Sequence, residues 1–236
     1  MRVRGRRECQ SCGAQWSYYE TGSVTCPECG SLRSVGLDER TRHTDAPVEF
    51  DLTPVRNRVD EATTRELAEQ AAERAGEYVR KRGFVSAGDL APLDAVYVAA
   101  TELQYAAEEI ARGLRTAEDE ELYFLALLRG ADEGERPPVE EVPDSLAQAR
   151  GLAMAAVTDA YQRDVRRILE DDPDPEARRL NGRIRDHRKR IEALDGDVDP
   201  ADAERLLKAT RDLGRYLDGE ESALVTADNW LSGIGY

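Results

Sequence analysis

Beyond residue 53, apolar residues recur every three or four positions, which is the period of an amphipathic helix. The first such stretch covers residues 53–83, where Thr53 followed by Pro54 is typical of a helix start and Gly83 of a helix end. The same period returns over residues 92–115. Two long helices are therefore expected in this part of the chain.

The next two helices differ in hydrophobicity. Residues 116–130 open with Thr116 and Asp119, which resemble a capping pair, and contain an apolar run at 122–128. That run predicts the most buried element of the chain. After an acidic loop rich in proline, a long helix is expected over residues 143–170. Four helices with short connections predict a bundle-like domain over residues 53–170.

Residues 171–236 carry two further helical segments, each opening with an Asp-Pro pair, at Asp174 and Asp199. Their apolar residues alternate at steps of three and four, as in a coiled-coil seam. This pattern predicts an antiparallel helical hairpin, followed by an apolar tail that docks back onto the protein. The seam of the first of these two helices consists of Leu180, Ile184, His187, Ile191 and Leu194.

The first 42 residues follow a different pattern and hold all four cysteines. These form two CxxCG motifs, Cys9 to Gly13 and Cys26 to Gly30, separated by thirteen residues. The two-residue gap lets both sulfurs of a motif face one ion, and the glycine permits the tight turn that follows. Short strands at 2–8, 14–20 and 32–37 would complete a three-stranded zinc ribbon. The predicted fold class is thus all-α with a small β zinc ribbon at the N-terminus.

One Zn²⁺ held by Cys9, Cys12, Cys26 and Cys29 is the favoured cofactor. Disulfides are the first alternative, but two close cysteine pairs in a chain expected to be cytoplasmic favour metal. Iron is the second, because rubredoxin-type sites also use two CxxCG motifs. A di-iron bundle is excluded, since it requires two Glu-x-x-His pairs. The sequence has only two histidines, His43 and His187, and the residues three positions before them are Arg40 and Ile184 rather than glutamate.

The cysteine motifs and their spacing resemble the transcription factor IIB-type zinc ribbon of archaea over about residues 5–37. The ribbon together with its acidic helical remainder resembles a haloarchaeal family of uncharacterised zinc-ribbon proteins. This resemblance implies that the four cysteines are metal ligands. The two cyclin-like repeats of a true initiation factor have no counterpart here, so polymerase recruitment does not follow from the ribbon alone.

The chain of 236 residues has a net charge of −15, and only three of its 33 basic residues are lysine. A strongly acidic, lysine-poor composition resembles that of proteins from extreme halophiles; an acidic protein from a high-GC genome is the alternative. Residues 1–42 have a net charge of +2, which leaves −17 for the rest. This change marks a boundary, with residues 43–52 as the linker.

Arginines beside aromatic residues make the ribbon a candidate surface for nucleic acid or a protein partner. On the alternative interpretation, Trp16 and Tyr18 share one strand face and shield the metal. A second basic segment, 178–190, holds seven basic residues and either binds a partner or pairs with acids of the following helix, namely Asp202, Glu204, Asp212 and Asp218. The candidate contact residues are Arg2, Arg4, Arg6, Arg7, Tyr19, Arg33, Arg183 and Arg190.

No nucleophile elbow, P-loop or dinucleotide-binding turn occurs in the sequence. No apolar run is long enough to span a bilayer, and no leader-like apolar stretch follows the basic N-terminus, so a cytoplasmic location without membrane contact is expected. The sequence favours a non-catalytic zinc-binding adaptor or regulator in transcription or another information-processing complex. Its partner would be protein, nucleic acid or a second copy of the chain. An enzyme with a carboxylate site in the bundle and a rubredoxin-like iron electron-transfer protein are the alternatives.

Overall fold

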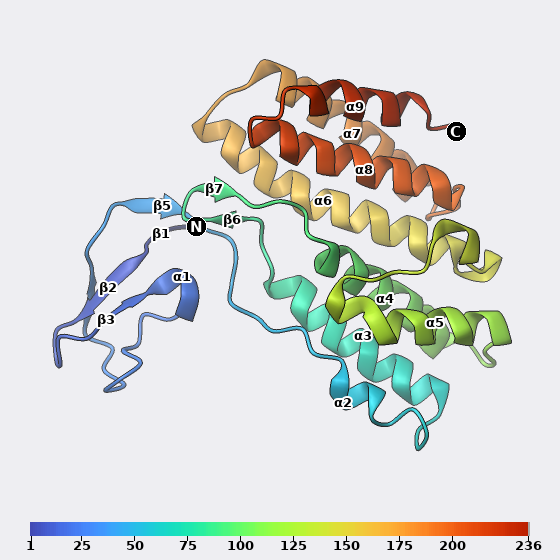
Figure 1. The fold of residues 1–236 in the computed structure, drawn as a ribbon, viewed down its shortest axis with the longest axis horizontal. Coiled ribbons are helices and arrows are strands. Elements are labelled where there is room, and N and C mark those ends of the chain that lie inside the picture. The colour runs from blue at the N-terminus through green and yellow to red at the C-terminus, as the bar shows by residue number, and fades with distance from the viewer. Residues whose placement is uncertain (236) are drawn as a thin grey trace.

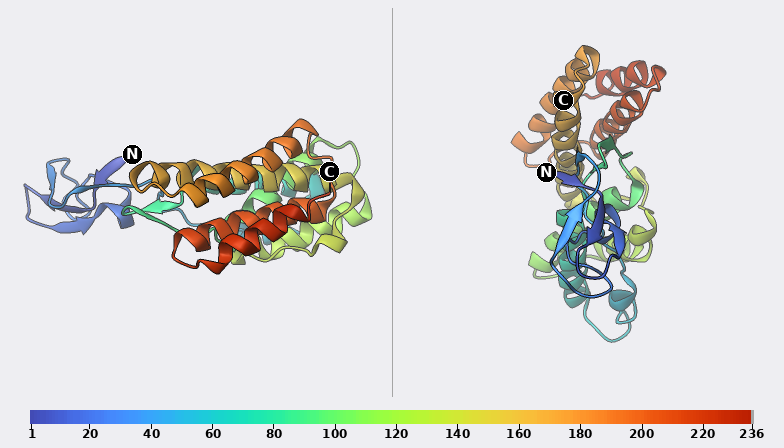
Figure 2. Two further views of the ribbon diagram at one scale, coloured as in Figure 1. Left: turned by 90° about the horizontal axis from the view of Figure 1, so that it is seen from above. Right: turned by 90° about the vertical axis from the view of Figure 1, so that its left-hand side faces the viewer.

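The computed structural model describes residues 1–235 and consists of a small N-terminal ribbon joined to a larger helical body (Figure 1). Seen from above, the ribbon projects from one end of the elongated helical body (Figure 2). Most of its surface is therefore free of contacts with the body. The fold class expected from the sequence is confirmed.

The ribbon contains a three-stranded antiparallel sheet of order β3-β2-β4 and a separate pair, β1-β5. The pairing of β1 with β5 brings the two ends of the ribbon together. The strand bounds are β1 Arg2–Arg4, β2 Arg6–Cys9, β3 Gln15–Ser17, β4 Ser34–Gly36 and β5 Arg40–Arg42.

All three strand predictions were too long, and the strand expected at 32–37 spans only Ser34–Gly36. The expected strand at 2–8 is interrupted at Gly5, where the ring of Tyr19 occupies the space that a side chain would need. The expected strand at 14–20 ends at Ser17, and the chain turns into a one-turn helix, α1 (Tyr18–Thr21). Tyr18 therefore does not share a strand face with Trp16.

The helical body is arranged in layers, with α4 and α6 at its centre (Figure 1). One hydrophobic core lies between α2, α3, α4 and α5, and a second lies between α4, α6, α7, α8 and α9. Within residues 1–235, no helix has both the length and the hydrophobicity required to cross a membrane. The helices are α2 Thr53–Arg56, α3 Thr64–Lys81, α4 Ala95–Arg112, α5 Glu118–Gly130, α6 Ala147–Asp171, α7 Pro175–Ala193, α8 Pro200–Leu217 and α9 Ser222–Ser232.

Short elements connect these helices. A small hairpin, β6 (Val85–Ser86) and β7 (Asp89–Leu90), lies between α3 and α4 and was not predicted. Three 3₁₀ helices, Ala131–Glu133, Val139–Glu141 and Asp144–Leu146, lie between α5 and α6.

The single helix expected over residues 53–83 is broken. The chain leaves helical structure after Arg56, and α3 starts anew behind Thr63. The Thr63 side chain accepts a hydrogen bond from the Glu66 amide, and Glu66 accepts one from the Thr63 amide. This reciprocal capping box is the local signal for the new start.

Helix α5 is less buried than predicted. Phe124 and Leu127 lie in the core, but the side chain of Leu122 is 63% exposed. The helix is also capped differently, because the Glu120 carboxylate accepts a hydrogen bond from the Ala117 amide at 2.8 Å. An apolar run longer than one helical face must expose some of its members unless neighbours surround it.

The C-terminal helices form the predicted hairpin, and the tail docks through α9, whereas Tyr236, the last residue of the predicted tail, lies outside the described residues. Asp174 accepts a hydrogen bond from the Ala177 amide at the start of α7, and Asp199 accepts one from the Ala201 amide at the start of α8. Both helices pack along α6 and against each other. Helix α9 packs on α8, with the indole of Trp230 donating to Asp212 at 3.1 Å.

Residues 43–52 contain neither helix nor strand, yet they are firmly attached to the body. The Thr44 hydroxyl donates to the Asp164 carboxylate of α6 at 2.6 Å, and the Thr44 amide donates to the Val85 carbonyl at 2.9 Å. Asp171 at the end of α6 accepts hydrogen bonds from Arg2 and Arg42 of the ribbon. The ribbon is thus fixed to the body through the two ends of its chain.

His43 lies at this junction, buried beside the rings of Tyr18 and Tyr19. Neither ring nitrogen has a hydrogen-bond partner among the described residues. Burial lowers the pKa of His43; the charge of Asp45 acts in the opposite direction, and the N-terminal amine of Met1 lowers the pKa further. The folded protein therefore holds His43 neutral.

Acid is expected to weaken this junction. In the unfolded chain the histidine titrates near 6.5, so as the pH falls below that value the unfolded state binds a proton that the folded state excludes. The free energy of unfolding should fall, and His43→Phe should remove part of that fall. Urea unfolding of both proteins between about pH 8 and pH 5 measures the difference. Parallel pH profiles for the two proteins would contradict this expectation.

Candidate metal centre

The two cysteine motifs fold into nearly identical turns. In each, the glycine amide donates to the carbonyl of the first cysteine, Gly13 to Cys9 at 2.9 Å and Gly30 to Cys26 at 3.0 Å. Both glycines have a positive φ, of 78° and 69°. That conformation is costly for residues with a side chain, which explains the glycine after each CxxC pair.

The turns bring all four sulfurs together. The Sγ atoms of Cys9, Cys12, Cys26 and Cys29 lie within 4.8 Å of one another. Two pairs join the two motifs, at 3.6 Å for Cys9 and Cys29 and 3.7 Å for Cys12 and Cys26. A tetrahedral ion with metal–sulfur bonds of about 2.3 Å requires sulfur separations of about 3.8 Å. The four cysteines are therefore positioned to bind one metal ion, and none of them forms a disulfide.

A minimal hydrophobic core supports the cluster. Cys9 and Cys26 are buried and pack with Trp16 and Ala14, whereas Cys12 and Cys29 are exposed. The Trp16 indole donates to the Ser23 carbonyl at 3.0 Å, which fixes the ring in place. Trp16 thus has the predicted shielding role. Tyr18 does not, because its ring lies near His43 instead.

Backbone hydrogen bonds and neighbouring thiols shift the pKa values of Cys9 and Cys12 in opposite directions. The amide of Ser11 donates to Cys9 Sγ at 3.4 Å and lowers the pKa of this thiol to about 6. For Cys12, the Ala14 amide lowers the pKa, but Cys29, burial and the other two thiols together raise it to about 12. Four thiolates this close repel one another, and a bound divalent cation compensates that repulsion. The donor set suits Zn²⁺ or iron, and a bound ion would supply the tetrahedral cross-link between the two turns.

Several of the predicted contact residues of the ribbon instead make contacts within the chain. Arg2 pairs with Asp171 at 2.7 Å, Arg4 donates to the Asp38 carbonyl, Arg7 donates to Ser34, and the Tyr19 hydroxyl bonds to Thr41. Arg6 and Arg33 are exposed on the ribbon, and no partner of their guanidinium groups is found among the described residues. These two arginines are the best placed of the set for contact with another molecule.

The basic segment 178–190 is paired, but not as predicted. Arg183 forms an ion pair with Asp228 of α9, and Arg188 pairs with Glu192 and Asp159. Arg190 also takes part in an interaction within the chain. Three of the four acids expected to partner this segment bind other arginines, Asp202 to Arg205, Asp212 to Arg215 and Glu204 to Arg136, and the fourth, Asp218, has no ion pair within residues 1–235. Asp202 and Asp212 bind the arginine three residues along the same helix, which is within easier reach than a residue on the neighbouring helix, whereas Glu204 pairs with an arginine 68 residues away.

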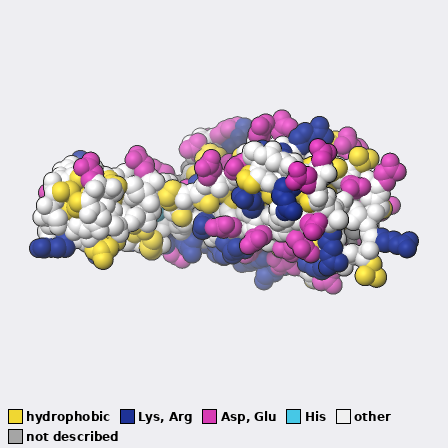
Figure 3. All heavy atoms as spheres, turned by 90° about the horizontal axis from the view of Figure 1, so that it is seen from below, with side chains coloured by type: hydrophobic (Ala, Val, Ile, Leu, Met, Phe, Trp, Pro, Cys, Tyr) yellow, Lys and Arg dark blue, Asp and Glu magenta, His cyan; other side chains and the backbone are white. Residues whose placement is uncertain are grey.

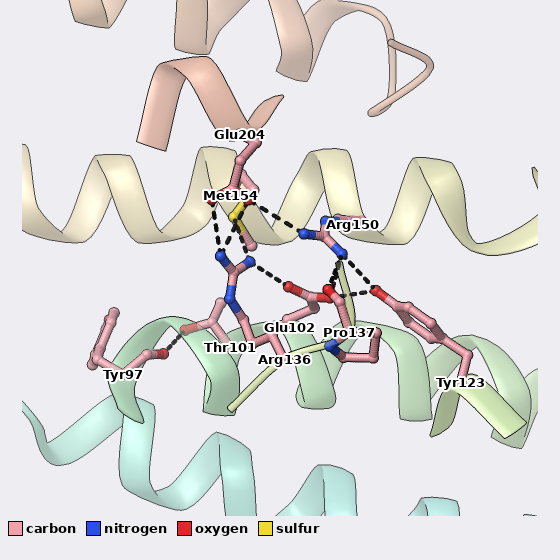
Figure 4. A network of polar contacts seen from close by, with 9 residues as sticks. All are labelled: Tyr97, Thr101, Glu102, Tyr123, Arg136, Pro137, Arg150, Met154 and Glu204. Atoms are coloured by element: carbon pink, nitrogen blue, oxygen red, sulfur yellow. Dashed lines mark hydrogen bonds and ion pairs between the residues drawn. The ribbon is translucent and has the colours of Figure 1, made fainter. Parts of the chain in front are cut away.

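The sequence reasoning missed a buried ionic network in the helical body (Figure 4). Glu102 of α4, 1% exposed, accepts hydrogen bonds from Arg136 at 2.7 Å and from Tyr123, and pairs with Arg150 at 3.1 Å. Glu204 of α8 pairs with Arg136 at 3.0 Å and Arg150 at 3.3 Å. The two negative carboxylates and the two positive guanidinium groups cancel in charge. The network therefore links helices and leaves no uncompensated charge. A glutamate in the largely apolar run 97–103 was the available signal.

Comparison with known proteins gives one result for the whole chain. No curated protein matches it, and no solved structure matches it. A family model described as "Family of unknown function (DUF7117)" matches residues 1–231, which covers both the ribbon and the helical body. The chain therefore belongs to this family of unknown function, DUF7117.

Proposed function

We propose that this protein is a zinc-binding, non-catalytic adaptor or regulator in transcription or another information-processing complex, and that its ribbon contacts the partner. The observation that carries the proposal is the four-sulfur cluster at the end of a projecting ribbon. Such a site has all four positions filled by protein, as structural zinc sites do, and leaves none open for a substrate. The resemblance to the transcription factor IIB-type ribbon supports the information-processing setting.

The surface of the ribbon favours protein as the partner. Leu32 is 74% exposed, and Val35 and Leu37, within five residues of it, are also exposed. Hydrophobic side chains are visible at this end of the molecule (Figure 3). Exposed apolar groups gathered in one place typify protein-binding surfaces, whereas nucleic acid is bound mainly through basic groups. Arg6 and Arg33 beside them would favour an acidic partner.

The test is affinity purification in multi-molar potassium chloride with the ribbon altered. The double variant Leu32→Ser, Arg33→Glu should lose polymerase or ribosome components that the unaltered protein recovers. Leu114→Ser is the matched control, because Leu114 is also exposed but lies after α4, outside the ribbon. Recovery that survives the ribbon variant, or that disappears after nuclease treatment, would argue against a protein contact through this surface.

A further inference from the structure

A cavity of about 300 Å³ lies between the end of α3, the start of α4 and the C-terminal half of α6. Phe84 and Ala160 contribute apolar lining, and four arginines, Arg80, Arg82, Arg163 and Arg167, line its walls. Asp164 is the acidic residue of the lining. In a chain with a net charge of −15, a cavity lined by four arginines and one acidic residue stands out.

The arginines are only partly neutralised by neighbours. Arg82 pairs with Asp45, and Arg167 pairs with Asp164 at 2.5 Å. Arg163 reaches Asp159 only through Nε, at 3.5 Å. Arg80 has no ion pair among the described residues. Two of the four guanidiniums therefore keep donors for a ligand.

The carboxylate of Asp164 is committed elsewhere. One oxygen accepts hydrogen bonds from the Thr44 hydroxyl at 2.6 Å and the Phe84 amide at 2.7 Å, and the other accepts from Arg167. The negative charge of Asp164 is thus compensated by three hydrogen-bond donors of the protein itself. An incoming anion would meet arginines rather than a free carboxylate.

A tyrosine hydroxyl completes the cavity. Tyr97 also lines it and is 3% exposed, yet its hydroxyl has no hydrogen-bond partner within residues 1–235. Burial raises the pKa of Tyr97 to about 12, against the opposing effect of the nearby Arg163 charge, so the group remains a proton donor at neutral pH. A ligand oxygen in the cavity would accept a hydrogen bond from this hydroxyl.

We propose that this cavity binds the phosphate group of a small organic phosphate monoester. Guanidinium groups match phosphate oxygens in geometry, and the arginines that line this cavity come from the end of α3 and from α6. The apolar lining suits the organic part, and the volume is at the lower end of the range of ligand pockets. The site is separate from the metal centre and does not depend on the function proposed for the ribbon.

The test is calorimetric titration of the full chain with AMP, inorganic phosphate and adenosine at constant ionic strength. AMP and phosphate should bind, and adenosine should not. Tyr97→Phe should weaken AMP binding about tenfold, which is the loss expected for one hydrogen bond to a charged group. Adenosine binding as tightly as AMP, or no binding of AMP or phosphate at all, would overturn the proposal.

Charge-matched variants separate the cavity from general electrostatics. Arg80→Ala with Arg163→Ala should weaken AMP binding more than tenfold, because it removes the two least-paired guanidiniums. Arg65→Ala with Arg179→Ala removes the same charge from exposed helical sites elsewhere and should leave binding unchanged. Circular dichroism confirms that each variant is folded. Equal losses of AMP affinity in the two double variants would exclude a small-molecule site. Binding of a single-stranded oligonucleotide but not of AMP would exclude it as well.

Discussion

Replacing Cys26 with serine is expected to release the metal ion and unfold residues 1–42 while the helical body stays folded. The core of the ribbon consists of little more than Trp16 and two cysteines, which cannot stabilise a fold without the ion. Structural zinc contributes about 10–16 kcal/mol of apparent binding free energy in comparable small sites. The body has its own two hydrophobic cores and needs no such cross-link.

Metal content and hydrogen exchange measure this result. The unaltered protein should contain one zinc per chain and protect the amides of β2 and β4; the variant should lose both. Ser31→Ala is the control, since Ser31 lies in the same turn but its hydroxyl contacts only the Ser11 hydroxyl and the Arg33 amide, and no cysteine. A variant that keeps its ribbon protected without metal would refute the structural role. One iron per chain and a red colour would instead support electron transfer.

Glu102→Gln is expected to destabilise the helical body by about 3–5 kcal/mol, the usual cost of leaving a buried charge uncompensated. The substitution keeps the shape of the side chain but removes the charge opposite Arg136 and Arg150. Arg150 is 2% exposed and already has one nitrogen, Nε, without a partner, so it cannot recover its hydration in the folded state. Urea unfolding followed by circular dichroism measures the change.

Two further variants test the physical cause. Glu108→Gln on the same helix breaks a partly exposed pair with Arg112 and should cost less than about 1 kcal/mol. Adding Arg150→Met to Glu102→Gln should restore part of the lost stability, because it removes the uncompensated charge. If Glu102→Gln and Glu108→Gln lower the free energy of unfolding by the same amount, the buried network does not stabilise the body as its burial implies.

The metal centre was the most predictable part of the chain. Both CxxCG motifs act through local geometry, since the two-residue gap and the following glycine determine the turn whatever the rest of the protein does. The starts of α7 and α8 were predictable for the same reason, because an Asp-Pro pair caps a helix through adjacent residues. The break between α2 and α3 could also have been predicted, from the capping box formed by Thr63 and Glu66.

The ion pairs were not predictable from sequence. With 33 basic and 48 acidic residues, almost every arginine has several candidate partners, and distance along the chain does not distinguish them. Arg183 binds an aspartate 45 residues away, whereas Arg205 binds one three residues away. The arginine-lined cavity and the Glu102 network likewise join residues from helices far apart in sequence.

The sequence by itself determined the four-thiol site, the helical nature of the remainder and the acidic surface, because these follow from residue spacing, periodicity and composition. Only the tertiary structure decided which charges form ion pairs and where His43 is buried. It also decided that the ribbon is attached to α6, through ion pairs of Arg2 and Arg42 with Asp171 and, just after the ribbon, the hydrogen bond of Thr44 with Asp164. Contacts of this kind depend on how helices pack, and packing is a property of the whole chain rather than of any local motif.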